Sequence, residues 1–230
     1  MIFQHQRPSL HSYVILASHA SFIVCIAEAL RRRLVVESVS LLLSAFISIF
    51  YHLCDENLHC AFGMDIYGWH AADVWSTFFL ICFVLGVMIL NIRDAFGRNA
   101  LRMAYLAAVT LFVWIDAGNM LLLGSLLVVV ATSVVLRFTW WPLEDKLSHA
   151  KRVERNKFLA VGLGTFALAL GCFVVANTPV VGPVTYNASI HGPQKPMDVP
   201  DTAVYWVFHS VWHFLSAVSG YFIIKYIVFR

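Results

Sequence analysis

Seven long apolar segments decide what this chain can fold into. A helix needs ~20 residues to cross the ~30 Å hydrocarbon core of a bilayer, and each segment is close to that length. Hydrophobic residues make up 60% of the 230 residues and charged residues only 13%, unlike the balance of a soluble domain. We expect an all-α, polytopic membrane protein, a seven-transmembrane-helix bundle that forms a single domain, residues 1–230. The expected spans are 13–30, 34–53, 66–91, 101–116, 118–137, 158–176 and 202–228.

The expected orientation follows from the distribution of Lys and Arg. Fourteen of the sixteen cationic residues fall in alternate connections or at the C-terminal end, and only Arg7 and Lys195 fall on the opposite side of the membrane. Cytoplasmic connections carry the excess of Lys and Arg, so we expect an exoplasmic N-terminus and a cytosolic C-terminus. The first span is followed by "RRR" and lacks the features of a cleavable signal peptide. Only "DAGN" separates spans four and five, and a re-entrant pair is the alternative there.

Charge and composition also restrict the partners and the compartment. The net charge of +3 is scattered, without a basic cluster, so we expect the lipid bilayer and a membrane lipid as partners and no nucleic acid. Asn187 begins "NAS", a glycosylation acceptor on the predicted exoplasmic connection between spans six and seven. Cys54 and Cys60 in "CDENLHC" could form a disulfide in an oxidising compartment, or remain two free thiols. We expect a glycoprotein of the plasma membrane or of a secretory-pathway membrane.

Four ionisable side chains inside the predicted spans carry the functional signal, because such residues are costly in a membrane and usually functional. His52 lies in the last exoplasmic turn of the second span, with Ser48 four residues earlier on the same face. Asp73 lies about two turns into the third span. In the seventh span, His209 lies ~10 Å below the exoplasmic edge and His213 one turn deeper. All four ionisable residues therefore fall in the exoplasmic half of the membrane.

This set of residues suits metal-assisted hydrolysis. Histidines four residues apart share one face of a helix, and a third histidine completes a three-nitrogen zinc site with one open position. We expect His52, His209 and His213 to bind zinc, which makes a nucleophile of water near neutral pH. Asp73 would orient or deprotonate that water, and Ser48 would donate a hydrogen bond to an oxyanion. The alternative is that these polar groups are helix-packing contacts.

Other polar residues receive weaker interpretations. His19, in the outer half of the first span, could support a metal ligand, and His70 lies near the mouth of the third span. Glu28 and Glu37 flank "RRR", and we expect them to pair with those arginines. Lys225 is too close to the cytosolic end for a retinal Schiff base, which argues against a rhodopsin-like pigment.

The arrangement resembles that of a seven-helix hydrolase superfamily, which includes alkaline ceramidases, adiponectin and progestin receptors and Per1-like GPI-remodelling proteins. The pattern is S-x-x-x-H late in span two, Asp in span three and H-x-x-x-H in span seven. The blocks "ALRRR", "FYHLCDE" and "HSVWH" are most similar to those of the transmembrane protein 8/myomaker family. The resemblance implies zinc ligation by His52, His209 and His213, with Ser48 and Asp73 completing the site.

Family members include a phospholipase A2 acting on GPI-anchored proteins and a muscle-cell fusion protein. The larger members carry an extracellular region before the helices, and the muscle protein has a cysteine-rich tail; about a dozen residues precede the first span here, and the sequence ends at Arg230. These departures argue against a fusion role and against recognition of a GPI-anchored protein.

Two classes of function remain at this stage. The first is a zinc-dependent intramembrane lipid hydrolase of phospholipase A2 or ceramidase type, with a membrane lipid such as a GPI lipid as substrate. The alternative is a non-enzymatic multipass scaffold or cell-fusion-related protein that retains a structural metal site. A receptor and a transporter are the third and fourth hypotheses.

Overall fold

The computed structural model describes residues 10–55, 59–81, 90, 92, 94–115, 128, 131–132, 135, 148–177 and 203–229. Every regular element in these ranges is helical, as the sequence predicts. The elements are α1 (Leu10–Ser18), the 3₁₀ turn η1 (His19–Ser21), α2 (Phe22–Arg31), α3 (Val35–Asp55), α4 (Ile66–Leu80), α6 (Ala95–Ile115), α8 (His149–Asn177) and α10 (Ala203–Val228).

Four helical segments are long and apolar enough to cross a membrane, by length and composition. They are Ser12–Arg31, Val35–Asp55, His149–Ala176 and Tyr205–Val228, which correspond to the first, second, sixth and seventh predicted spans. Helices α4 and α6 correspond to the third and fourth. Most of the fifth predicted span and the connection that carries Asn187 lie outside the described residues. The chain is thus a multi-pass helical membrane protein, and the number of seven spans stays a prediction.

Two helices begin earlier than hydropathy predicts. Helix α8 begins at His149 and not at 158, and α6 begins at Ala95 and not at 101. The Asp94 carboxylate accepts a hydrogen bond from the Gly97 backbone N–H at 2.5 Å, and the Ser148 hydroxyl accepts one from the Lys151 N–H at 3.4 Å. Polar capping side chains fix where a helix starts, whereas hydropathy marks only its apolar part. Residues 149–157 are therefore the first part of a long helix.

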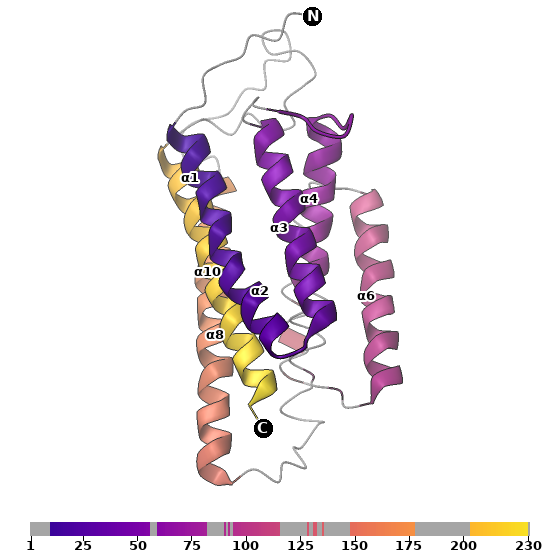
Figure 1. Ribbon diagram of the computed structural model, residues 1–230, viewed down its shortest axis with the longest axis vertical. Coiled ribbons are helices and arrows are strands. Elements are labelled where there is room, and N and C mark those ends of the chain that lie inside the picture. The colour runs from indigo at the N-terminus through magenta and orange to yellow at the C-terminus, as the bar shows by residue number, and fades with distance from the viewer. Residues whose placement is uncertain are drawn as a thin grey trace, which may run out of the picture.

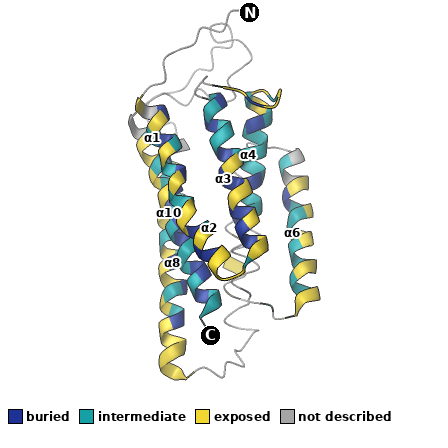
Figure 2. Cartoon of the chain, in the orientation of Figure 1, coloured by how far each residue is buried: buried dark blue, intermediate teal, exposed yellow. Residues whose placement is uncertain are grey.

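Helix α10 organises the bundle. It packs against α8, α1, η1 and α2, while α3 packs against α2 and α4, and α4 packs against α6. Figure 1 shows α1 and α2 running on from one another beside α10, with α6 at the edge of the bundle. Buried residues lie on the facing sides of the helices, and the outer surfaces are exposed, as in α6 (Figure 2).

Small residues bring α10 close to its neighbours. The Ser219 hydroxyl donates a hydrogen bond to the Gly162 carbonyl of α8 at 2.7 Å, and the Cys25 thiol donates one to the Ala217 carbonyl at 2.6 Å. A Cβ atom on Gly162 would lie 2.8 Å from the Cδ1 atom of Ile223. Small side chains at crossings let the backbones approach, which is how membrane helices gain packing energy. These contacts hold α10 in place.

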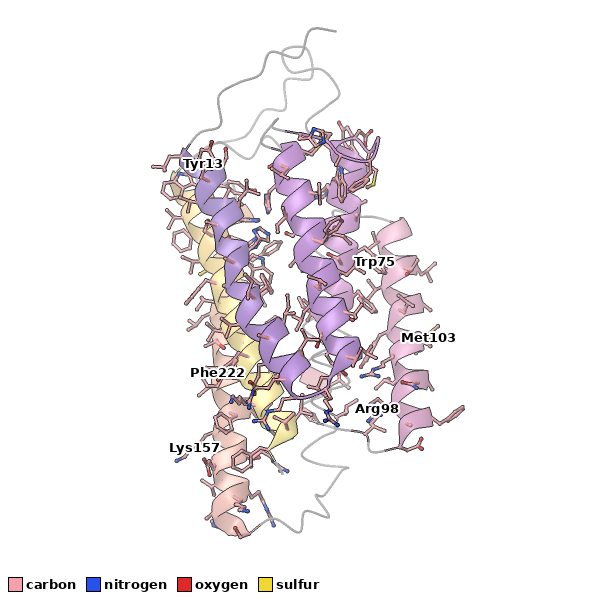
Figure 3. All side chains as sticks on the ribbon, viewed as in Figure 1. Tyr13, Trp75, Arg98, Met103, Lys157 and Phe222 are labelled. Atoms are coloured by element: carbon pink, nitrogen blue, oxygen red, sulfur yellow. A yellow bond between two sulfur atoms is a disulfide. The ribbon has the colours of Figure 1, made fainter. Side chains whose placement is uncertain are left out.

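The cationic side chains gather at one end of the bundle. In Figure 3, Arg98 and Lys157 lie toward the lower end, whereas Tyr13 lies at the upper end. The described Lys and Arg residues all lie around the α2–α3 connection, the starts of α6 and α8, and the end of α10. This one-sided distribution is the one expected from the sequence.

Glu28 and Glu37, at this end of the bundle, both form ion pairs, and the partner of Glu37 differs from the predicted one. Glu28 accepts hydrogen bonds from Arg31 at 2.8 Å and from Arg32 at 3.1 Å, as predicted, and its Oε1 lies 3.3 Å from the Lys225 ammonium. Glu37 pairs with Arg102 of α6 and not with the "RRR" segment. Glu37 lies in the first turn of α3, so its partner is decided by which helix packs there, and sequence proximity does not reveal that.

Candidate metal centre

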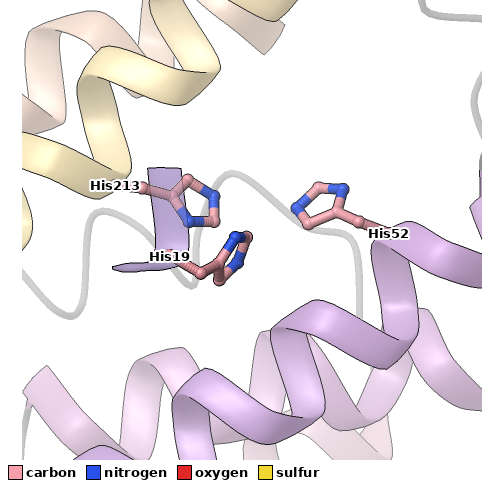
Figure 4. A group of neighbouring side chains, drawn as sticks. All are labelled: His19, His52 and His213. Carbon is pink, nitrogen blue, oxygen red and sulfur yellow. The ribbon is translucent and has the colours of Figure 1, made fainter. Parts of the chain in front are cut away.

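Three buried histidines from three separate elements meet in the upper half of the bundle. His19 comes from η1, His52 from the last turn of α3 and His213 from α10, and they are only 3%, 0% and 4% exposed. Each ring offers one nitrogen, and these nitrogens lie within 4.8 Å of one another. Figure 4 shows the three rings converging. Such a group could hold a metal ion.

His209 joins this group through His52. The Nε2 atoms of the two rings are 3.1 Å apart, and the His209 ring centroid lies 4.8 Å from that of His213. The structure thus brings together the three histidines predicted as ligands and adds His19, whose ring centroid is 4.0 Å from that of His213.

Several ring nitrogens of this cluster lack hydrogen-bond partners among the described residues. Nε2 of His19, Nδ1 of His52 and Nδ1 of His209 are buried and unpartnered. A buried polar atom without a partner costs ~1–3 kcal/mol, so a group that binds any of these nitrogens would stabilise the site.

The donor set fits zinc. Two nitrogens bound to tetrahedral zinc at ~2.05 Å lie ~3.3 Å apart, close to the 3.1 Å between His52 and His209. The ligand atoms of His19, His52 and His213 lie within 4.8 Å of one another and would have to approach by at most ~1.5 Å to reach the same spacing. Imidazole ligands also suit copper, iron and nickel.

Asp73 and Ser48 lie beside the histidines. Ser48 and Asp73 line the same space, and Oδ1 of Asp73 is buried and has no hydrogen-bond partner among the described residues. Both residues line the same cavity as His209 and His213. The predicted catalytic pair is therefore next to the predicted ligands.

The cavity has a volume of ≈ 140 Å³ and a mostly apolar wall. Its lining follows α10 from His209 to Gly220, which is ~16 Å along a helix. Leu41, Phe166 and Ile81 contribute to the wall away from the histidines. A polar end joined to an apolar length matches a molecule with a reactive polar group and a hydrocarbon chain.

A disulfide closes the connection that follows His52. Cys54 and Cys60 are bonded, so the bonded alternative is confirmed. The connection is also held by Trp69, whose indole N–H donates to the Ala61 carbonyl at 3.3 Å. His70 packs against the ring of Tyr51, with centroids 5.5 Å apart. This cross-linked connection fixes the end of α3 that carries His52.

A family model described as "Protein of unknown function (DUF3522)" matches residues 9–190, more than half of the chain. The chain belongs to this DUF3522 family. The matched segment contains His19, Ser48, His52 and Asp73, whereas the two histidines of α10 lie beyond it. No match to the chain was found among curated proteins.

In this DUF3522 chain the sequence predicts His19 only as a support for a metal ligand, whereas the structure places its ring beside those of His52 and His213. Nothing in the sequence indicates that α1 lies against α10 and α3. Depth was the available signal: His19 is ~9 Å inside the first span, the same depth as His209.

Proposed function

We propose that this DUF3522 protein is a zinc-dependent hydrolase that cleaves an ester- or amide-linked acyl chain of a membrane lipid. The proposed site lies in the exoplasmic half of a seven-helix bundle whose N-terminus is exoplasmic and whose C-terminus is cytosolic. The substrate would be a glycerophospholipid, a ceramide or a GPI lipid. The resemblance to the transmembrane protein 8/myomaker family supports the same class of reaction.

One observation carries the proposal: Asp73, Ser48, His209 and His213 all line one cavity between the helices, and the wall of that cavity is mostly apolar. A structural polar contact between helices would not need such a space. An acyl chain in the apolar part would leave the bond next to its carbonyl beside the histidines.

In this proposal His52, His209 and His213 hold the zinc ion. Zinc bound there would supply a water nucleophile near neutral pH and polarise the substrate carbonyl. Asp73 accepts a proton through its unpartnered Oδ1, which makes it the general base. Ser48 lines the same cavity as Asp73 and is the candidate donor to an oxyanion. The apolar wall excludes bulk water.

The test combines metal analysis with a lipid assay. Tag-free protein purified in detergent should retain about one zinc per chain, and His213→Ala should lose it, because truncating one of three ligands weakens a metal site. Reconstituted protein is then incubated with GPI lipid, glycerophospholipid or ceramide, and released fatty acid is measured.

The matched control is His70→Ala, which removes a histidine that packs against Tyr51 and is outside the cluster. We expect His70→Ala to retain zinc and fatty acid release, and His209→Ala to lose release. Equal and low zinc content in wild type and His213→Ala would contradict the metal site. Zinc without release from any of the lipids would contradict the hydrolase.

The second candidate is a non-enzymatic membrane scaffold with a structural metal. It is favoured by His19, which forms a group of possible metal ligands with His52 and His213 and, with His209 beside His52, brings the histidines at the site to four. Four protein ligands are typical of structural zinc and three of catalytic zinc. It predicts that His52→Ala lowers the melting temperature of metal-loaded protein, with no lipid turnover in wild type.

A further inference from the structure

His19 lies at an irregularity of the first membrane-spanning segment. The α-helix ends at Ser18, and His19–Ser21 form a 3₁₀ turn before α2 begins. The hydroxyl of Ser18 donates to the Ile15 carbonyl at 2.6 Å and that of Ser21 to the Ser18 carbonyl at 2.7 Å. Such back-bonds bend helices, and 3₁₀ turns inside a helix often mark hinges.

The two nitrogens of His19 have different surroundings. Nδ1 lies 3.0 Å from the Ile15 carbonyl oxygen, and since a carbonyl only accepts, Nδ1 carries the proton. Nε2 therefore has a free lone pair, and it is buried with no hydrogen-bond partner among the described residues. Histidines that bind metals almost always donate their other N–H in this way, often to a backbone carbonyl.

The ring of His19 belongs to the histidine cluster. His19, His52 and His213 are the three residues whose ligand atoms lie within 4.8 Å of one another. The ring centroid of His19 is 4.0 Å from that of His213 and 5.4 Å from that of His52. The position of His19 in the cluster and the proton on its Nδ1 both suit a metal ligand. A histidine that only packs between helices needs neither of these properties.

We propose that His19 is a fourth metal ligand, so that histidine nitrogens fill all four positions in this conformation. The inference rests on the proposed function for the other three ligands and adds a way to regulate the same site. Hydrolytic zinc needs one position free of protein ligands. That position becomes available when His19 withdraws, and the turn at His19–Ser21 is where the helix can flex.

The test counts ligands directly. Tag-free wild type, His19→Ala and His19→Phe are loaded with one equivalent of Zn²⁺ for X-ray absorption, and with Co²⁺ for optical spectra. We expect four imidazoles per metal in wild type and three in both variants. Azide should alter the Co²⁺ spectrum of the variants and leave that of wild type unchanged, because only the variants have a position for it.

Two variants keep the test independent of folding. The ring centroid of His19 lies 6.4 Å from that of Phe22 and 4.0 Å from that of His213. His19→Phe keeps a ring of similar size between these two neighbours. His70→Ala serves as the matched control and should keep four imidazoles. Each variant is compared with wild type by thermal unfolding without metal.

The outcomes separate this inference from the proposed function. Three imidazoles in both wild type and His19→Phe, with azide binding to both, would overturn the role of His19 and leave the three-histidine site intact. Wild type that retains no metal would overturn both proposals. Four imidazoles in wild type with no lipid hydrolysed by any variant would uphold the closed site and remove the hydrolase.

Discussion

Replacing Gly162 by alanine should destabilise the protein, although the same change normally strengthens a helix. The added Cβ would lie 2.8 Å from Cδ1 and 3.0 Å from Cγ1 of Ile223, and 3.4 Å from the Ile223 backbone nitrogen. Ile223 is 0% exposed, so its side chain has little room to move away. Helix α10, which carries His209 and His213, would have to shift instead.

Two opposing contributions set the magnitude. Alanine is favoured over glycine inside a helix by ~1 kcal/mol, whereas overpacking a close-packed contact costs ~1–3 kcal/mol. We expect a net loss of up to ~2 kcal/mol in the free energy of unfolding. For a chain of this length that corresponds to a melting temperature lower by roughly 4–8 °C.

The matched control is Gly164→Ala in the same helix. A Cβ on Gly164 would meet nothing within 4 Å, so only the helix preference remains and the free energy should rise by up to ~1 kcal/mol. The measurement is thermal unfolding in detergent, followed by circular dichroism. Ile223→Val, which removes the nearest methyl group, should recover part of the loss in the double variant. If Gly162→Ala and Gly164→Ala are equally harmless, α8 and α10 do not approach as closely as described.

Three further changes test other parts of the structure. Replacing Cys54 and Cys60 by serine should lower the free energy of unfolding by ~2 kcal/mol, because the disulfide closes a short loop. Dithiothreitol should lower the melting temperature of wild type and leave that of the variant unchanged. Glu28→Gln should cost ~1–2 kcal/mol, because Glu28 is buried but its partners Arg31 and Arg32 are exposed, and such pairs contribute up to ~1 kcal/mol each. The exposed Glu154→Gln should leave the melting temperature within ~1 °C, and equal effects would refute the role of the Glu28 ion pairs. Asp73→Asn should reduce fatty acid release ~10²–10⁴-fold at unchanged zinc content, and loss of zinc in this variant would instead make Asp73 part of the metal site.

The all-helical class could be predicted because it depends on local properties of the chain. Long apolar segments need internally satisfied backbone groups in a membrane, and that requirement acts on each segment by itself. The pairing of Glu28 with Arg31 and Arg32 was also predictable, since residues three and four apart share a helix face. The starts of α6 and α8 were not, because capping by Asp94 and Ser148 is independent of hydropathy.

The sequence alone predicted a common depth for His52, Asp73, His209 and His213, because depth follows from the position of a residue along its own helix. Which rings touch depends on how the helices rotate and tilt against one another. That was decided by contacts between distant residues, such as Cys25 with Ala217 and Ser219 with Gly162. Only the tertiary structure could therefore place His19 among the other histidines, since its proximity comes from the packing of α1 and η1 against α10.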